Sequence, residues 1–244
     1  MIDNMIVFGF QIFRNGRFPA VLAMAVLWFF PGWSSSAAGP EQNIHFTRIS
    51  IESGLSQSTI FSIAQDRTGN MWFATYDGVN KYDGYGFTVY QHQIGDTTSI
   101  ADDITRTLCA DLDGRIWVGT ASGLSLYDED MDIFRNYTYK GIPSAVNVIY
   151  PLSESLLLVA LDDRVTVFDI RKRTFRDDVL PVSMLPLKAT AVTSGDGRLF
   201  MGTDAGELFV YEPGKNLIYP MPEFSSGGGG ASRHCCWKMT GISM

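Results

Sequence analysis

The sequence has few residues of the kinds that build metal and catalytic sites, with three histidines and three cysteines among 244 residues. His45, His92 and His234 show no metal-ligand spacing to one another or to cysteine, so we predict no metal site and no cofactor. Motifs for a nucleophile elbow, a phosphate loop or a kinase phosphoacceptor are missing as well, which argues against an enzyme. The net charge of −7 argues against a nucleic-acid partner, because such a partner requires a basic face.

Long apolar runs are also scarce, and the main one lies near the N-terminus. Arg14 and Arg17 precede an apolar run at residues 18–30, which is short for a membrane span of about 20 residues. Ser36 and Ala38 stand in the −3 and −1 relation that signal peptidase requires. We interpret residues 1–38 as a cleaved secretory signal peptide, with a retained anchor or a buried helix as the alternative. The exported chain then has no membrane span, and Cys109 alone in its body gives no disulfide framework.

The sequence does contain an internal repeat. QDRTGNMWFATYDGVNKYD at residues 65–83 matches ADLDGRIWVGTASGLSLYD at 110–128. A third, degenerate copy, LSESLLLVALDDRVTVFD, occupies 152–169. The fourth copy, SGDGRLFMGTDAGELFVYE at 194–212, again has the Asp-Gly and Gly-Thr pairs. The tryptophan position recurs at Trp72, Trp117, Leu158 and Phe200, so the spacing is 45, 41 and 42 residues. A unit of about 40–45 residues is typical of a β-propeller blade.

Each unit predicts four short strands. In the second unit we expect strands at 104–111, 115–120, 124–128 and 133–139, with tight turns at Asp113-Gly114 and Ser122-Gly123. The fold class is therefore all-β, an incomplete β-propeller of about four four-stranded blades. We assign the propeller to residues 39–224, with blade repeats near 58–92, 104–139, 146–177 and 188–221. Four blades are too few to close a ring of about seven, so an open strand edge is expected.

We assign the repeated residues a structural role in the blades. The tryptophan is expected to pack between blades, and the small residue before threonine leaves room for a neighbouring backbone. The other aspartates of these turns, Asp196 among them, are interpreted as turn residues. The motif residues are Asp66, Gly69, Trp72, Thr75 and Tyr82 in the first unit, Asp113, Gly114, Trp117, Gly119, Thr120 and Tyr127 in the second, and Gly197, Phe200, Gly202 and Thr203 in the fourth.

The stretch SGLSQSTIFSIAQDRTGNMWFATYDGVNKYDGYGFTVY and the segment DGRIWVGTASGLSLYD resemble the two-component regulator propeller repeat. The resemblance implies the periplasmic sensor region of a Bacteroidetes hybrid two-component histidine kinase, which senses oligosaccharides and, when intact, can form a homodimer. This chain departs from that family because it lacks a second propeller, a membrane span after the signal, a kinase and a helix-turn-helix. WD40-type propellers differ because their Gly-His and Trp-Asp pairs are absent here.

The C-terminal stretch HCCWKMTGISM, residues 234–244, follows four glycines and matches no repeat as written. When its codons are read after dropping two bases, the genetic code forces Leu-Leu-Leu-Glu, then Asp or Asn, then Asp. One permitted reading, LLLEDDGNIYV, resembles LCADLDGRIWV of the second unit, and its aromatic position falls about 43 residues after Phe200, on the repeat period. We interpret residues 225–244 as a Gly-rich stretch and an out-of-frame fifth blade, with a divergent terminus as the alternative.

Propellers bind ligands at loops around one end of the central channel, and here these loops carry Tyr76, Asp77, Asp102, Asp103 and Arg106. An aromatic ring beside carboxylates and a guanidinium suits a sugar, although exposed loop residues without a ligand remain the alternative. Three functions stay open: the N-terminal fragment of a sensor propeller whose ligand is an oligosaccharide, a free-standing exported binding propeller, and a propeller lyase. The first is favoured by the resemblance, and the lyase would need a metal site or a general base.

Overall fold

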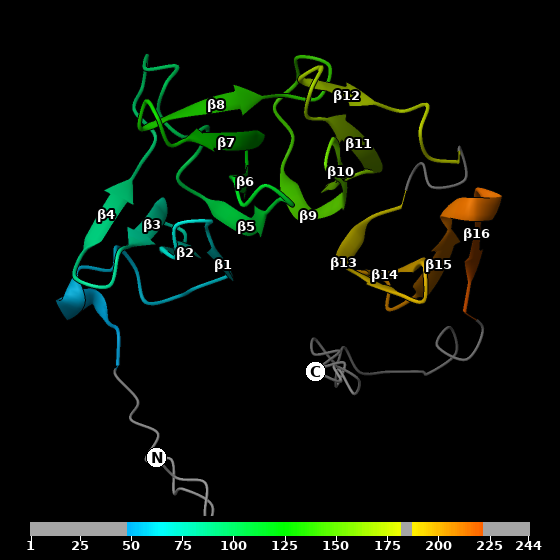
Figure 1. The fold of residues 1–244 in the computed structure, drawn as a ribbon, viewed down its shortest axis with the longest axis horizontal. Coiled ribbons are helices and arrows are strands. Elements are labelled where there is room, and N and C mark those ends of the chain that lie inside the picture. Colours follow the sequence, from blue (N-terminus) through cyan, green and yellow to red (C-terminus); the bar gives the residue numbers. More distant parts are fainter. Residues whose placement is uncertain (1–47, 182–186, 222–244) are drawn as a thin grey trace, which may run out of the picture. The chain divides into compact units, whose positions relative to one another are not determined.

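The computed structural model describes residues 48–181 and 187–221, all within the unit of the chain that begins at Arg48. Two earlier interpretations, the signal peptide at 1–38 and the out-of-frame tail at 225–244, lie outside the described residues. Within the described ranges, no helix is long and apolar enough to cross a membrane. Figure 1 shows this part of the chain as a succession of short strands.

The strands form four separate four-stranded antiparallel sheets, each built from consecutive strands. The first sheet contains β1 (Ser62–Gln65), β2 (Met71–Ala74), β3 (Val79–Tyr82) and β4 (Phe87–Tyr90), and the second contains β5 (Thr105–Ala110), β6 (Ile116–Thr120), β7 (Leu124–Asp128) and β8 (Ile133–Tyr137). The third contains β9 (Val146–Ser153), β10 (Leu156–Leu161), β11 (Val165–Asp169) and β12 (Thr174–Arg176), and the fourth contains β13 (Ala189–Gly195), β14 (Arg198–Thr203), β15 (Leu208–Glu212) and β16 (Leu217–Pro220).

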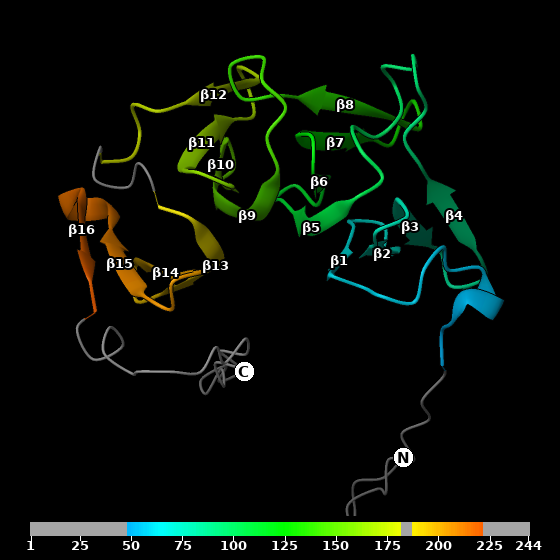
Figure 2. The ribbon, with the colours of Figure 1, turned by 180° about the vertical axis from the view of Figure 1, so that it is seen from behind.

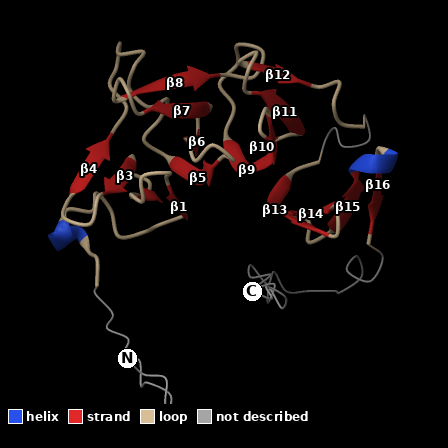
Figure 3. Cartoon of the chain, viewed as in Figure 1, coloured by secondary structure: helices blue, strands red, loops and turns tan. Residues whose placement is uncertain are grey.

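The helical content of the described residues is two single 3-10 turns, η1 (Ile51–Ser53) and η3 (Pro213–Lys215), drawn in blue in Figure 3. The all-β prediction is therefore confirmed, and each sheet corresponds to one blade of a propeller. The first strands β1, β5, β9 and β13 neighbour one another in chain order, and the views in Figures 1 and 2 agree on this arrangement. These innermost strands consequently bring equivalent positions of the four repeats side by side.

The second sheet shows how closely the repeat predicts the strands. Its four strands fall inside the four expected segments, and β7 coincides with the expected range. The hairpin between β5 and β6 turns at Gly114, whose φ of 74° is in the left-handed region that glycine adopts without strain. In the fourth sheet both Asp196 and Gly197 have positive φ, as a two-residue hairpin turn of the primed type requires.

The residue at the tryptophan position packs against the next sheet in each of the first three repeats. Trp72 contacts Tyr127 of the second sheet with ring centroids 4.7 Å apart, and Trp117 meets Phe168 of the third sheet edge-on at 5.4 Å. Leu158 takes the same position in the third sheet and shares a buried cluster with Tyr211 of the fourth. The predicted packing of tryptophan between blades is thus confirmed, and the apolar core consists of three clusters, each between two successive sheets.

Glycine is required where successive sheets approach most closely. A Cβ on Gly119 would lie 2.9 Å from the carbonyl oxygen of Val146 in the third sheet, a distance at which the backbone would have to move. A Cβ on Gly114 would meet the backbone of Arg67 in the first sheet at 3.1 Å. The expectation that a small residue before threonine leaves room for a neighbouring backbone is confirmed at Gly119.

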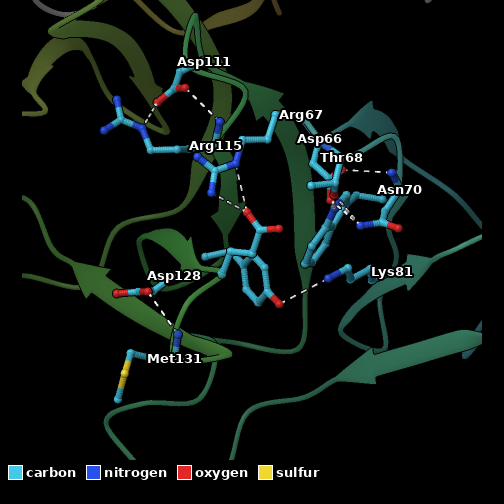
Figure 4. A network of polar contacts seen from close by, with 12 residues as sticks. Asp66, Arg67, Thr68, Asn70, Lys81, Asp111, Arg115, Asp128 and Met131 are labelled. Carbon is cyan, nitrogen blue, oxygen red and sulfur yellow. Dashed lines mark hydrogen bonds and ion pairs between the residues drawn. The ribbon is translucent and has the colours of Figure 1, made fainter.

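An aspartate organises the turn between the first two strands of each of the first two sheets. The Asp66 carboxylate accepts hydrogen bonds from the Asn70 and Thr68 N–H groups and from the Trp72 indole N–H at 2.8 Å. The Asp111 carboxylate likewise accepts the Trp117 indole N–H at 2.8 Å. It also accepts the Arg115 guanidinium N–H at 2.8 Å, a contact drawn in Figure 4. The bond from the indole fixes the buried tryptophan relative to its own turn.

The choice of Asp113 as the motif aspartate of the second repeat therefore needs correction. Asp113 does lie in the turn, but its side chain is largely exposed and pairs with Arg115 at 2.9 Å. Asp111, which stands 45 residues after Asp66, takes the role that Asp66 has in the first sheet. The Asp-Gly pair drew attention to the wrong carboxylate, because Thr68 occupies the place of Asp113 in the first repeat.

The threonine of the motif closes the opposite turn. The hydroxyls of Thr75, Thr120 and Thr203 donate to the carbonyl oxygens of Gly78, Gly123 and Glu207, at 2.8, 3.0 and 3.4 Å. Each bond shapes the link from the second to the third strand of its sheet. The backbone conformation of these links is therefore set by the repeat itself, and the residues between the bonded ends are presented outward.

Candidate ligand-binding face

The candidate residues lie at one end of the strands. Because the sheets are antiparallel, the β2–β3, β6–β7, β10–β11 and β14–β15 turns and the links between sheets share one end, and the aspartate turns lie at the other. The first turn is tied to the next sheet, since the Gly78 N–H donates to the Asp103 carbonyl oxygen at 2.8 Å and the Thr105 N–H to the Thr75 carbonyl oxygen at 3.0 Å. This end forms the candidate ligand-binding face.

Tyr76 is the one aromatic residue among the five predicted site residues. It lies in the β2–β3 turn and is 52% exposed, and its ring meets that of Phe61 with centroids 4.2 Å apart. The Tyr76 N–H donates to the Gln57 side-chain oxygen at 3.2 Å. The contact with Phe61 braces the tyrosine ring while about half of the residue stays exposed, an arrangement that suits stacking on a flat ligand.

Asp77 and Asp103 mainly hold the loop together. The Asp77 carboxylate accepts a hydrogen bond from the Gln91 amide at 2.8 Å, and the Asp103 carboxylate accepts the His92 backbone N–H at 2.6 Å. Both donors belong to the segment that leads from the first sheet to the second. These contacts agree with the alternative interpretation of turn and loop residues, and they leave part of each carboxylate free to accept from a ligand.

Asp102 and Arg106 bond to other elements than that pair. One Asp102 carboxylate oxygen accepts the Ser122 hydroxyl at 2.6 Å, and the other accepts the Ile104 N–H at 2.9 Å. Arg106 donates to the Asn147 side-chain oxygen at 2.7 Å and pairs with Asp162 at 3.3 Å. The structure therefore brings Tyr76, Asp77 and Asp103 together, joins Asp102 to the second sheet's own turn, and directs Arg106 to the third sheet.

Sequence reasoning missed three residues of this face: Phe61, Asn147 and Asp162. Phe61 could have been found from the repeat, because it stands 45 residues before Arg106. Asp162 lies in the β10–β11 turn, the equivalent of the Tyr76 turn, but the third repeat is too worn for its alignment to single it out. In the described part of the chain, no group of three or more His, Cys, Asp or Glu residues is arranged to hold a metal ion.

A hollow of about 410 Å³ lies elsewhere, between the end of β8 and β12. Two of its lining side chains bond to one carboxylate: Lys140 pairs with Asp177 at 3.0 Å, and the Tyr139 hydroxyl donates to the same group at 2.6 Å. Hydrogen bonding to Tyr139 and Asp177 raises the pKa of Lys140. The hollow contains none of the five predicted site residues, Tyr76, Asp77, Asp102, Asp103 and Arg106.

Comparison with known proteins bears on this arrangement. Residues 54–77, which run from η1 through the Tyr76 turn, match the family model described as Two component regulator propeller. This segment of the chain is thus similar to the two-component regulator propeller repeat. The chain is also 39% identical over 66 residues to Histidine kinase P4 of Formosa agariphila, a match that covers 27% of this chain and 5% of that protein.

Solved structures share the fold. The extracellular domain of the putative hybrid two component system BT3049 from B. thetaiotaomicron superposes with a TM-score of 0.59 and 26% identity, over 72% of this chain and 26% of that chain. A catalytically inactive virginiamycin B lyase from Staphylococcus aureus superposes with a TM-score of 0.55 and 12% identity, over 69% of this chain and 57% of that chain. The second likeness concerns the fold alone. The chain spans a small part of the sensor proteins that it matches.

Proposed function

We propose that the chain is the N-terminal part of the exported, periplasmic sensing propeller of a hybrid two-component sensor, and that it binds an oligosaccharide at its candidate ligand-binding face. The observation that carries the proposal is the braced, exposed Tyr76 at the same end of the strands as the Arg106–Asp162 pair. Sugar rings stack on aromatic faces while their hydroxyls bond to charged and amide groups. The likeness to an extracellular domain of a hybrid system supports the cellular setting.

Signal transfer in this proposal lies outside the chain. A kinase and a transcription output would follow in the same polypeptide, so the chain binds ligand without catalysing a reaction. A free-standing exported binding propeller is the second candidate. The DNA sequence beyond the Met244 codon separates the two, because a sensor gene continues with further repeats, a membrane helix and a kinase.

Calorimetry against a glycan panel tests the binding. We expect the full chain to bind at least one oligosaccharide, and Tyr76→Ala to weaken that binding about two- to tenfold, since one aromatic contact contributes roughly 0.5–1.5 kcal/mol. The matched control is Tyr85→Ala, because Tyr85 is almost fully exposed in the β3–β4 turn, at the other end of the strands.

Failure of every glycan to bind would contradict the proposal. Equal loss of binding in Tyr76→Ala and Tyr85→Ala would place the site away from this face. Release of cleaved product from a bound glycan would favour the propeller lyase, the third candidate, over a sensor.

A further inference from the structure

The innermost strands of three sheets contain the same irregularity. In β5, β9 and β13 the pairing with the next strand shifts by one residue near the start of the strand. The extra residue is Arg106 in β5, Asn147 in β9 and Thr190 in β13. These residues are 41 and 43 positions apart, so the bulge recurs with the repeat.

Each bulge turns one side chain out of the sheet. The residue immediately before it, Thr105, Val146 or Ala189, is completely buried. The bulged residue itself is partly exposed in Arg106 and Asn147 and exposed in Thr190. A bulge that inserts one residue re-aims a side chain in this way, and such bulges are frequent beside binding sites. The strand therefore keeps its apolar packing and still presents a polar side chain at the candidate ligand-binding face.

The bulged side chains of the second and third sheets contact each other. Arg106 donates to the Asn147 side-chain oxygen at 2.7 Å, and the Asn147 amide donates to Asp162 at 2.9 Å. Phe61 holds the equivalent place just before β1, where its N–H donates to the Ala74 carbonyl oxygen and its ring braces Tyr76. The bulge row, defined as Phe61, Arg106, Asn147 and Thr190, thus crosses all four sheets.

The chemistry of the bulge row changes along its length. It begins with the Phe61–Tyr76 aromatic pair, continues with a guanidinium, an amide and a carboxylate, and ends with the Thr190 hydroxyl. Arg106 and Asp162 form an ion pair at 3.3 Å, so their charges offset each other. A strongly anionic ligand would meet the carboxylates of this face unfavourably, whereas neutral hydroxyls can both donate to and accept from these groups.

We propose that the bulge row is the binding surface for a linear, uncharged oligosaccharide, with one sugar ring on the Phe61–Tyr76 pair and later rings along Arg106, Asn147 and Thr190. This inference rests on the proposed function and names both its ligand class and its residues. One ligand spans several blades because equivalent residues of successive blades are neighbours. Ligand binding would then report on the relative position of the sheets.

Calorimetry of the full chain with defined probes tests the inference. The neutral probes are cellohexaose, laminarihexaose and xylohexaose, and the anionic probe is hexagalacturonate. We expect a neutral probe to bind, and both Arg106→Ala and Asn147→Ala to weaken it about two- to tenfold, as loss of one net hydrogen bond implies. Arg135→Ala is the matched control, because Arg135 in β8 also pairs with an aspartate and its side chain is 40% exposed, against 37% for Arg106.

The outcomes separate this inference from the proposed function. If Arg106→Ala and Asn147→Ala keep the wild-type affinity while Tyr76→Ala loses affinity, the bulge row is not the binding surface, and the proposed function still holds. If hexagalacturonate binds more tightly than every neutral probe, the inference that the ligand is uncharged is wrong. Binding of no probe at all overturns the inference together with the proposed function. Circular dichroism verifies folding, and Asn147→Ser replaces any variant that does not fold.

Discussion

Ile63 in the first sheet and Leu108 in the second stand 45 residues apart at the same position of the repeat, yet Ile63 is 54% exposed and Leu108 is 7% exposed. The same contrast holds for Val89 and Phe134, which are also 45 residues apart: Val89 is exposed and Phe134 is buried. The two sheets present equivalent apolar faces, and only the second is covered.

The neighbouring sheet explains the difference. Trp72 and Val79 of the first sheet share a buried cluster with Leu108 and Phe134 of the second. Ile63 belongs to none of the clusters formed by the described residues. A blade buries one face only through the blade before it, because each repeat unit has too little core of its own. The contribution of a residue to the stability of the protein therefore depends on its place in the series of sheets as much as on its type.

The largest effect is expected from truncating the tryptophan between the second and third sheets. Trp117→Ala should lower the free energy of unfolding by about 3–5 kcal/mol, because a fully buried ring is lost and Asp111 loses its indole donor. A thermal melt followed by circular dichroism measures the change. Tyr76→Ala is the control and should melt like the wild type. A large fall in melting temperature for Tyr76→Ala, with none for Trp117→Ala, would mean that Tyr76 belongs to the core and Trp117 does not.

The second prediction tests the uncovered face directly. Leu108→Ala should cost about 2–5 kcal/mol, as buried leucine truncations do. Ile63→Ala at the equivalent position should change stability by roughly 0.5 kcal/mol or less, because an exposed side chain loses little packing. Urea unfolding of both variants gives the comparison. Similar losses in the two variants would mean that another element covers Ile63 in solution.

The smallest effect concerns the turns of the same two sheets in acid. Burial tends to raise the pKa of Asp66, but hydrogen bonds from Trp72, Thr68 and Asn70 outweigh it and lower the pKa to about 2. This lies below the value of about 3.9 for an unfolded aspartate. Ionised Asp66 therefore stabilises the fold above about pH 4, and this contribution is lost as the pH falls from about 4 toward 2.

Asp66→Asn should accordingly destabilise the protein by roughly 0.5–1.5 kcal/mol at pH 7, the size of one net hydrogen bond. The difference from the wild type should shrink as the pH falls to about 2.5, which urea unfolding across the pH range measures. Asp113→Asn is the control, because Asp113 is exposed and is not bonded to a tryptophan. Parallel stability profiles for Asp66→Asn and the wild type would show that Asp66 does not act through its charge.

Much of the fold could be predicted from the repeat. Alternation at Ile116 and Val118, and at Leu124 and Leu126, predicts strands because successive side chains point to opposite faces. Asp-Gly pairs predict hairpin turns, since they accept positive φ. These signals are local, so they need no knowledge of the neighbouring sheets. The sequence analysis selected Asp113 as the motif residue of its turn and did not predict the hydrogen bond from the Trp117 indole to Asp111, because that bond depends on how the buried ring lies.

The candidate site was less predictable. Tyr76 and Arg106 were predicted as loop residues, a placement that is wrong for Arg106, which lies within β5. Asn147 and Asp162 were not predicted, because their association with Arg106 crosses from the second sheet to the third. Contacts between residues 41 and 56 positions apart leave no local pattern in a single sequence. The bulges were also invisible, since a strand with one extra residue has an ordinary composition.

The amino-acid sequence by itself determined the elements of this protein: the repeat length, the strands within each unit, the turn residues and the aromatic residue that packs between sheets. The tertiary structure alone decided which equivalent faces are buried and which side chains meet at the candidate ligand-binding face. The physical reason is the range of the interactions along the chain. Strand alternation and turn conformation depend on neighbours in the chain, whereas burial of Leu108 and the Arg106–Asn147 bond depend on sheets that the chain brings together only after folding.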